Sequence, residues 1–245
     1  MSEQFVYGVH AVSALLQNPY RKINCVYVSE DRHDDKVERI LSQASQLKIP
    51  VERLAIQAMN QRFKDIVHQG VAALAKPMPD YGERDIPTLL DIAKDPCLIL
   101  ILDGVTDPHN LGACLRSADA AGADFVIIPK DKSATITPVV TKVACGAAET
   151  MPLVRVTNLV RALQILKERG VWIYGAAGEA QHAIYQLDAK MPLAMILGAE
   201  GKGMRRLTRE HCDQLFSLPM LGSVSSLNVS VATGISLYEV VRQRI

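Results

Sequence analysis

The stretch CLILILDGVTDPHNLGACLRSADAAG, residues 97–122, joins an unbroken apolar run to a segment rich in small residues with helical spacing. The run at 97–102 shows no polar alternation, which is typical of a strand buried on both faces of a parallel sheet. Similar short runs lie at 125–128, 172–174, 193–197 and 215–218, and helical patterns lie between or after them at 111–121, 138–148, 158–169 and 228–242. This alternation predicts an α/β domain with a largely parallel sheet and helices on both sides.

The first third of the chain has shorter elements. Helical patterns at 8–16, 34–48 and 56–63 alternate with strand candidates at 24–28, 51–54 and 70–75. The stretch KPMPDYGERDIPTLLDIAKDP, residues 76–96, then interrupts the pattern with prolines and charges. We therefore expect a small α/β domain at 1–76, a linker at 77–93 and a larger α/β domain at 94–245.

The composition is that of a soluble globular protein, with 49% hydrophobic and 22% charged residues among 245. No signal peptide is recognisable at the N-terminus, and the longest apolar run is far too short to span a membrane. The five cysteines are scattered without a C-x-x-C pair, and His109 has no matching ligand cluster, so we expect reduced thiols in a cytoplasm and no metal site.

The net charge of +1 neither supports nor excludes a nucleic-acid partner, which would need local basic clusters. Two such clusters occur, one with Lys202, Arg205, Arg206 and Arg209, the other with Arg242 and Arg244. Solvated helix faces would explain them equally well.

Three predicted strand or helix ends carry unusual polar and glycine content, and ligands of parallel sheets bind outside the carboxyl ends of strands. In the first, Asn110 is a possible N-cap, Gly112 allows close approach of a backbone or ligand, and Arg116 stands among small residues. A capped helix with an exposed arginine is the simpler alternative.

The second is LAMILGAEGKGM, residues 193–204, with Gly198, Gly201 and Gly203 around Glu200. Its order is neither a dinucleotide fingerprint nor a phosphate loop, and Glu200 disfavours a bound pyrophosphate. The glycines leave backbone amides open to a ligand, although a tight turn alone would also use them.

The third is GSVSSLNVSVATG, residues 222–234, in which apolar residues recur at helical spacing from Val224 towards Tyr238. Ser226 and Asn228 therefore stand at a helix N-terminus, where they can cap it or hold a ligand. Ser230 and Gly234, one turn apart, are small enough to admit another helix.

Together the motifs N-x-G-x-x-x-R (110–116), G-x-E-G-x-G (198–203) and S-L-N-V-S (226–230) resemble the three signatures of the SpoU family of RNA ribose methyltransferases, in the SPOUT superfamily. The resemblance covers essentially the whole chain. It implies a deep trefoil knot near the C-terminus, an L30e-like substrate-binding domain in the first third, and a homodimer formed through the C-terminal domain. It further implies S-adenosylmethionine bound by backbone groups around Gly198, Leu218, Met220 and Leu227.

The same resemblance implies methyl transfer to the ribose 2′-hydroxyl of a guanosine in large-subunit ribosomal RNA. Arg116 is the residue implied to activate the hydroxyl, with Asn110, Glu200, Ser226 and Asn228 holding the reactants and Arg116 in register. Since a guanidinium rarely loses its proton, Arg116 can instead bind a phosphate and stabilise the developing alkoxide. The first domain and the cluster at 202–209 are expected to contact RNA phosphates.

Other functions stay open at this point. A tRNA or resistance-type ribose methyltransferase of the same family is the nearest alternative. A non-catalytic RNA-binding protein with the same fold would need to have lost activity while keeping all the motif residues. A nicotinamide or flavin oxidoreductase is suggested only by glycines after strands, and the chain lacks the dinucleotide fingerprint.

Overall fold

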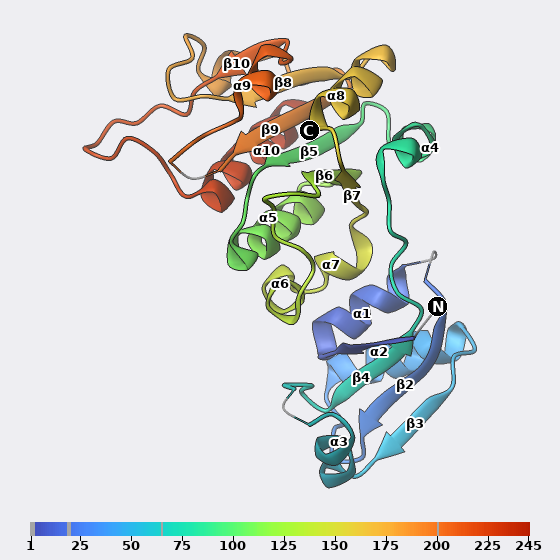
Figure 1. Ribbon diagram of the computed structural model, residues 1–245. Coiled ribbons are helices and arrows are strands. Elements are labelled where there is room, and N and C mark those ends of the chain that lie inside the picture. The colour runs from blue at the N-terminus through green and yellow to red at the C-terminus, as the bar shows by residue number, and fades with distance from the viewer. Residues whose placement is uncertain (1–2, 19–20, 65, 200) are drawn as a thin grey trace. The chain divides into compact units, whose positions relative to one another are not determined.

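The computed structural model describes residues 3–18, 21–64, 66–199 and 201–245 (Figure 1). The chain forms two compact units, one of residues 1–79 with 145–150 and the other of residues 80–144 with 151–245. Within the described part of the chain, every helix is too short or too polar to cross a membrane.

The first unit is a four-stranded sheet in the order β1-β4-β2-β3. Its strands are β1 (Gln4–Tyr7), β2 (Ile23–Ser29), β3 (Val51–Leu54) and β4 (Val71–Ala75). The sequence predicted all but β1, a four-residue strand that antiparallel pairing with β4 stabilises. Strand β2 runs antiparallel to β4 and parallel to β3.

Two apolar clusters lie on opposite faces of this sheet. Helices α1 (Val9–Gln17) and α2 (Asp35–Gln46) bury Leu15 and Ile40 in one of them. The short helix α3 (Ile56–Arg62) places Met59 in the other, against Phe63 and Tyr27. The first unit is thus a four-stranded sheet with apolar side chains packed against helices on both faces.

The second unit is a six-stranded sheet in the order β10-β8-β9-β5-β6-β7, with every neighbouring pair parallel. The strands are β5 (Leu98–Asp103), β6 (Phe125–Pro129), β7 (Leu153–Val156), β8 (Trp172–Ala176), β9 (Leu193–Gly198) and β10 (Gln214–Phe216). The prediction of a buried parallel sheet is confirmed. Strand β7 was missed because its four residues include the polar Arg155.

Helices cover both faces of the large sheet (Figure 1). Helices α4 (Ile86–Ile92) and α8 (Leu159–Glu168) share a core with alternate strand residues such as Ile99 and Ile101. Helices α5 (Pro108–Ala120), α6 (Pro138–Ala144) and α10 (Val229–Arg244) lie on the opposite face, and the short α9 (Arg206–Glu210) follows β9. Three layers therefore enclose the strands.

The predicted linker is ordered over most of its length. Residues 83–92 form the 3-10 turn η1 (Glu83–Asp85) and helix α4, whose Ile86 and Leu89 are buried in the core of the second unit. Tyr81 also bridges to Val154 at the edge strand β7. The prolines of this stretch indicated irregular structure, but Pro87 is compatible with a helix. It lies in the first turn of α4, where its missing amide hydrogen costs no hydrogen bond.

The helix predicted at 138–148 is interrupted. Helix α6 ends at Ala144, and Cys145 and Gly146 then take positive φ values of 52° and 103°. The following helix α7 (Ala147–Thr150) belongs to the first unit. A Cβ on Gly146 would lie 2.8 Å from Cβ of Ala14 in α1, so close packing requires glycine there.

Candidate active site

Strands β5 and β9 end side by side, and Asp103 ties together the segments that follow them. Its backbone oxygen accepts a hydrogen bond from the Ala199 amide at 3.1 Å. Its carboxylate Oδ2 accepts one from the Arg205 amide at 2.8 Å, and the residue is only 1% exposed. Asp103 therefore anchors both ends of the glycine-rich loop at 199–205.

This loop folds back over Gly198. A Cβ on Gly198 would lie 2.1 Å from the carbonyl carbon of Gly203, so only glycine fits. Gly201 and Gly203 have φ values of 73° and 63°, and a Cβ on either would meet nothing within 4 Å. The glycine-rich loop therefore combines a tight turn at Gly198 with exposed backbone at Gly201 and Gly203. Glu200, a predicted site residue, lies outside the described residues.

The start of α5 differs from the prediction in one respect. Asp107, not Asn110, is the N-cap, since its side chain accepts from the His109 amide at 3.0 Å. Pro108 at the first helical position fixes the start earlier than the sequence pattern indicated. Asn110 is therefore inside the first turn, where its side chain is available for contacts outside α5.

Gly112 makes the close approach expected of it. A Cβ there would lie 2.8 Å from Cβ of Val143 and 2.9 Å from the oxygen of Val140, both in α6. Arg116 follows Gly112 by four residues, so it shares the helix side turned towards α6, and it is exposed. Its exposure fits both a surface arginine on a capped helix and a side chain that is accessible to a ligand.

The first and third motifs meet through their asparagines. Asn228 Nδ2 donates to Asn110 Oδ1 at 3.0 Å. Of the residues expected to cap the last helix or hold a ligand, Asn228 is the N-cap of α10, because its Oδ1 accepts from the Ser230 amide at 2.9 Å. A side-chain contact of 3.3 Å between Cys114 Sγ and Thr233 Oγ1 joins the same two helices, and burial raises the pKa of Cys114 to about 11.

Gly234 also faces α5, since a Cβ there would lie 3.8 Å from Ser117 Oγ. This is an ordinary van der Waals distance, so the packing of α10 against α5 does not require glycine at this position.

The remaining predicted residues lie on the connection between β10 and α10, which extends away from the sheet (Figure 1). Leu218, Met220 and Leu227 are half-buried, and Ser226 is exposed. The neighbouring Leu221 is 100% exposed. The structure thus brings Asn110 and Asn228 together but leaves Ser226 apart from any hydrogen-bond partner in the described part of the chain.

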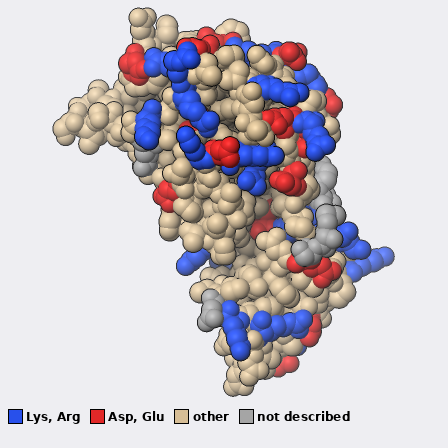
Figure 2. All heavy atoms as spheres, viewed as in Figure 1, with Lys and Arg blue, Asp and Glu red and all other residues tan. Residues whose placement is uncertain are grey.

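The basic cluster at 202–209 is largely paired with acids. Arg206 pairs with Glu210 and Arg209 with Glu179, both at exposed positions. Arg205 pairs with the buried Asp103. Figure 2 accordingly shows basic and acidic side chains interspersed over the visible face of this unit.

The basic C-terminal pair has structural contacts. Arg244 donates to the backbone oxygens of Pro96, Cys97, Ala189 and Met191, at 2.7–3.2 Å. Arg242 pairs with Glu239 and lowers the pKa of that carboxyl. Sequence reasoning missed these roles because the carbonyl partners of Arg244 lie more than 50 residues away along the chain.

A parallel sheet with polar side chains and a glycine-rich loop at its carboxyl edge is the framework of an α/β enzyme that binds its ligand there. Residues 97–238 match the model of the SpoU rRNA Methylase family. Residues 5–81 match the model described as RNA 2'-O ribose methyltransferase substrate binding. The chain belongs to the SpoU rRNA Methylase family.

Curated relatives match this chain over nearly their whole length. The chain is 59% identical to the 23S rRNA (guanosine-2'-O-)-methyltransferase RlmB of Pseudomonas putida over 239 residues, which cover 98% of this chain and 96% of that protein. It is 56% identical to the enzyme of the same name from Photobacterium profundum, covering 100% and 99% of the two chains.

Among solved structures, the SpoU methyltransferase AviRb from Streptomyces viridochromogenes in complex with the cofactor AdoMet is similar in fold. It superposes with a TM-score of 0.79 at 24% identity, covering 99% of this chain and 90% of that one. SpoU methyltransferases use S-adenosylmethionine as the methyl donor.

Proposed function

We propose that this chain transfers a methyl group from S-adenosylmethionine to the ribose 2′-hydroxyl of a guanosine in 23S ribosomal RNA. The names of relatives at 52–59% identity over nearly the whole chain support the substrate. The structural observation that carries the proposal is the hydrogen bond between Asn110 and Asn228, which joins the first and third family motifs into one site.

The cofactor, when bound, supplies an electrophilic sulfonium methyl group. A ribose hydroxyl is a poor nucleophile at neutral pH, so the protein must align it and stabilise the charge that forms as its proton leaves. Arg116 is exposed on α5, and a guanidinium group suits binding a phosphate and stabilising an alkoxide better than acting as a base. In this scheme Asn110, Glu200, Ser226 and Asn228 hold the ribose and Arg116 in register.

The residues proposed to hold the cofactor fit a ligand bound through the backbone. Gly201 and Gly203 have open space where a side chain would be, so the chain presents peptide groups there. Gly198 begins this loop, and the half-buried Leu218, Met220 and Leu227 offer apolar contacts from the connection before α10. We further propose that this connection completes a trefoil knot around the cofactor, as in the family.

Helix α10 supports the proposed homodimer. Its polar residues Thr233 and Ser236 are fully buried, whereas Val231 and Tyr238 are 50% and 52% exposed. Val229, Leu237 and Val240 of the same helix are buried within the chain, so α10 carries apolar side chains on more than one side. A second copy of the chain would cover the exposed ones. Val231→Glu combined with Tyr238→Glu should convert a dimer to a monomer in light scattering; a wild-type monomer at micromolar concentration would refute this assembly.

The first unit is proposed to be an L30e-like domain that captures RNA, in keeping with the substrate-binding model matched over residues 5–81. We propose that this domain spans residues 1–76 and that the methyltransferase domain spans residues 94–245, with the segment 77–93 between them. The exposed pairs of Arg206 and Arg209 are weak enough for RNA phosphates to replace the carboxylates. Cytoplasmic ribosome assembly is the proposed setting.

The decisive experiment is ribose-methylation mapping of ribosomal RNA from cells with and without the gene. Loss of one 2′-O-methylguanosine in 23S RNA, restored by the wild-type gene, is the expected result. An unchanged ribosomal map with a lost tRNA methyl would assign the chain to the tRNA enzymes of the family. Unchanged maps of both would leave only a non-catalytic RNA-binding role.

A further inference from the structure

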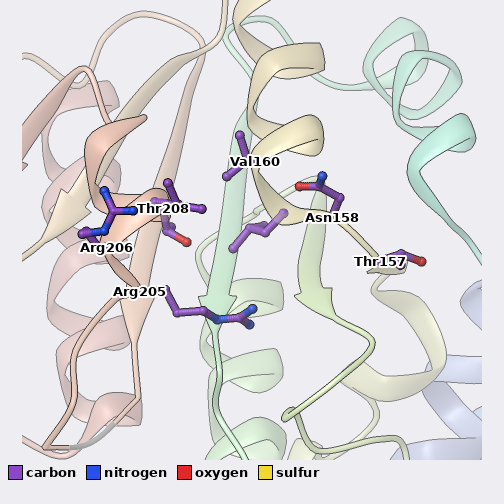
Figure 3. A pocket seen from close by; sticks show the side chains of 8 residues that line it. Thr157, Asn158, Val160, Arg205, Arg206 and Thr208 are labelled. Carbon is purple, nitrogen blue, oxygen red and sulfur yellow. The ribbon is translucent and has the colours of Figure 1, made fainter.

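A hollow of about 590 Å³ opens in the second unit and lies apart from the paired asparagines. It is lined by residues 157–160, which follow β7 and begin α8, and by residues 205–208, which precede and begin α9 (Figure 3). Its volume is within the range of ligand sites. None of its lining residues is part of the three family motifs.

Arg205 lies at this hollow beside a buried carboxylate. Its Nε lies 2.8 Å from Oδ1 of Asp103, whose side chain is fully buried, while the arginine side chain is 50% exposed. The other carboxylate oxygen accepts the backbone amide of Arg205. Figure 3 shows the guanidinium reaching across the end of a central strand towards the side of α8. The terminal N–H groups of Arg205 therefore lie at the hollow, and the geometry of a guanidinium matches the oxygens of a phosphate.

Lys130 brings a second cation to the same edge. It follows β6, and its backbone amide donates at 2.8 Å to the oxygen of Val156, the residue before Thr157. Its side chain is exposed and pairs with no carboxylate among the described residues, unlike Arg206 and Arg209. The charge of Lys130 is therefore available to a ligand.

The start of α8 does not itself supply the anion site. Glu83 Oε1 already accepts the amides of Thr157 and Asn158, at 2.8 and 2.7 Å. The exposed Asp131 adds a further negative charge beside Lys130. Binding of an anion here must consequently depend on the two basic side chains, which makes the site testable by substitution.

We propose that this hollow binds a backbone phosphate of the RNA substrate, with Arg205 as its principal ligand and Lys130 beside it. The inference rests on the proposed RNA substrate, and it assigns to this hollow a nucleotide next to, rather than at, the methylated ribose. Thr157 and Asn158 offer hydrogen bonds to that nucleotide, and Leu207, half exposed, offers an apolar surface for its base.

The test compares Arg205→Met and Lys130→Gln with Lys190→Gln in the full-length protein. Lys190 is exposed and precedes β9, at the opposite end of the sheet from the hollow. Lys190→Gln is therefore a control that removes one positive charge away from the proposed site. Each variant is titrated with unmethylated 23S RNA over a range of salt concentrations, and separately with S-adenosylhomocysteine. Lys130→Gln keeps the test valid if Arg205→Met folds poorly because Asp103 is left unpaired.

We expect Arg205→Met and Lys130→Gln to weaken RNA binding by about threefold to tenfold and to lower the salt dependence by about one phosphate contact. Affinity for S-adenosylhomocysteine should stay unchanged, and Lys190→Gln should bind RNA like wild type. RNA affinity within twofold of wild type for both test variants would overturn the inference. So would an equal loss for Lys190→Gln, or a parallel loss of cofactor affinity. Methyl transfer by the wild-type protein tests the proposed function separately.

Discussion

Asn228 Nδ2 donates a hydrogen bond of 3.0 Å to Asn110 Oδ1, although the two residues are 118 positions apart. Because Asn228 also caps α10 and Asn110 lies in the first turn of α5, this bond aligns the starts of two helices. Arg116 and Ser230 belong to the same helices. Together with the contact between Cys114 and Thr233, this bond links the first and third motifs.

Removing either amide should impair catalysis through this alignment. Asn228→Ala loses both the cap and the bond and should cost about 1–2 kcal/mol in the free energy of unfolding, while Asn110→Ala should cost about 1 kcal/mol or less. Denaturant titrations of both single variants and the double variant measure the coupling between them. A coupling energy of zero would mean that the bond does not form in solution.

Arg116→Ala should abolish methyl transfer to 23S RNA, with a loss of at least about a hundredfold, because it removes the cation that stabilises the developing charge. Since the side chain is exposed, the free energy of unfolding should hardly change. Cofactor affinity, measured by calorimetry with S-adenosylhomocysteine, should be retained. Activity of Arg116→Ala close to wild type would remove this residue from the mechanism.

Two helical glycines should respond in opposite directions to alanine. Gly112→Ala would bring a Cβ to 2.8 Å from Val143 and should destabilise the protein by about 1–3 kcal/mol. Gly234→Ala would meet only Ser117 Oγ at 3.8 Å, an ordinary contact, and should stabilise α10 by about 0.5–1 kcal/mol. Thermal unfolding of the two variants checks this, and equal shifts of Tm would contradict the packing described here.

The C-terminal arginine should matter for stability rather than for RNA. Arg244→Met leaves four backbone oxygens without this donor, and we expect a loss of at least about 2 kcal/mol in the free energy of unfolding. Arg242→Met, whose guanidinium is largely exposed, should cost less than about 1 kcal/mol. A larger loss of RNA affinity than of stability in Arg244→Met would contradict this structural role.

Stability should fall at alkaline pH partly because of Cys114. Burial raises its pKa from 9.0 to about 11, so the thiol releases its proton in the unfolded chain first. The stability that the buried neutral thiol contributes to the folded chain is fully present below pH 9 and is lost as the pH rises towards 11. Between pH 8 and 10.5 the loss should be about 2 kcal/mol, and smaller in Cys114→Ala. Identical pH profiles for wild type and variant would exclude this contribution.

Much of the fold was predictable because its strands are buried on both faces. Runs such as 97–102 and 193–197 must enter a covered parallel sheet, and they do so as β5 and β9. The helix at 83–92 was not predictable, since only packing of Ile86 and Leu89 against the sheet outweighs the prolines around them. The break between α6 and α7 likewise depends on contacts of Gly146 with α1.

The sequence by itself determined most of the strands and helices, the three motifs and the start of the last helix near Asn228, because these depend on local periodicity and backbone preference. Only the tertiary structure decided which side chains meet: Asn110 with Asn228, Asp103 with Arg205, and Arg244 with four distant carbonyls. It also decided that α10 buries Thr233 and Ser236 and exposes Val231 and Tyr238. The physical reason is that these contacts join strand ends and helices 50 to about 150 residues apart, and no local preference encodes which surfaces the folded sheet places together.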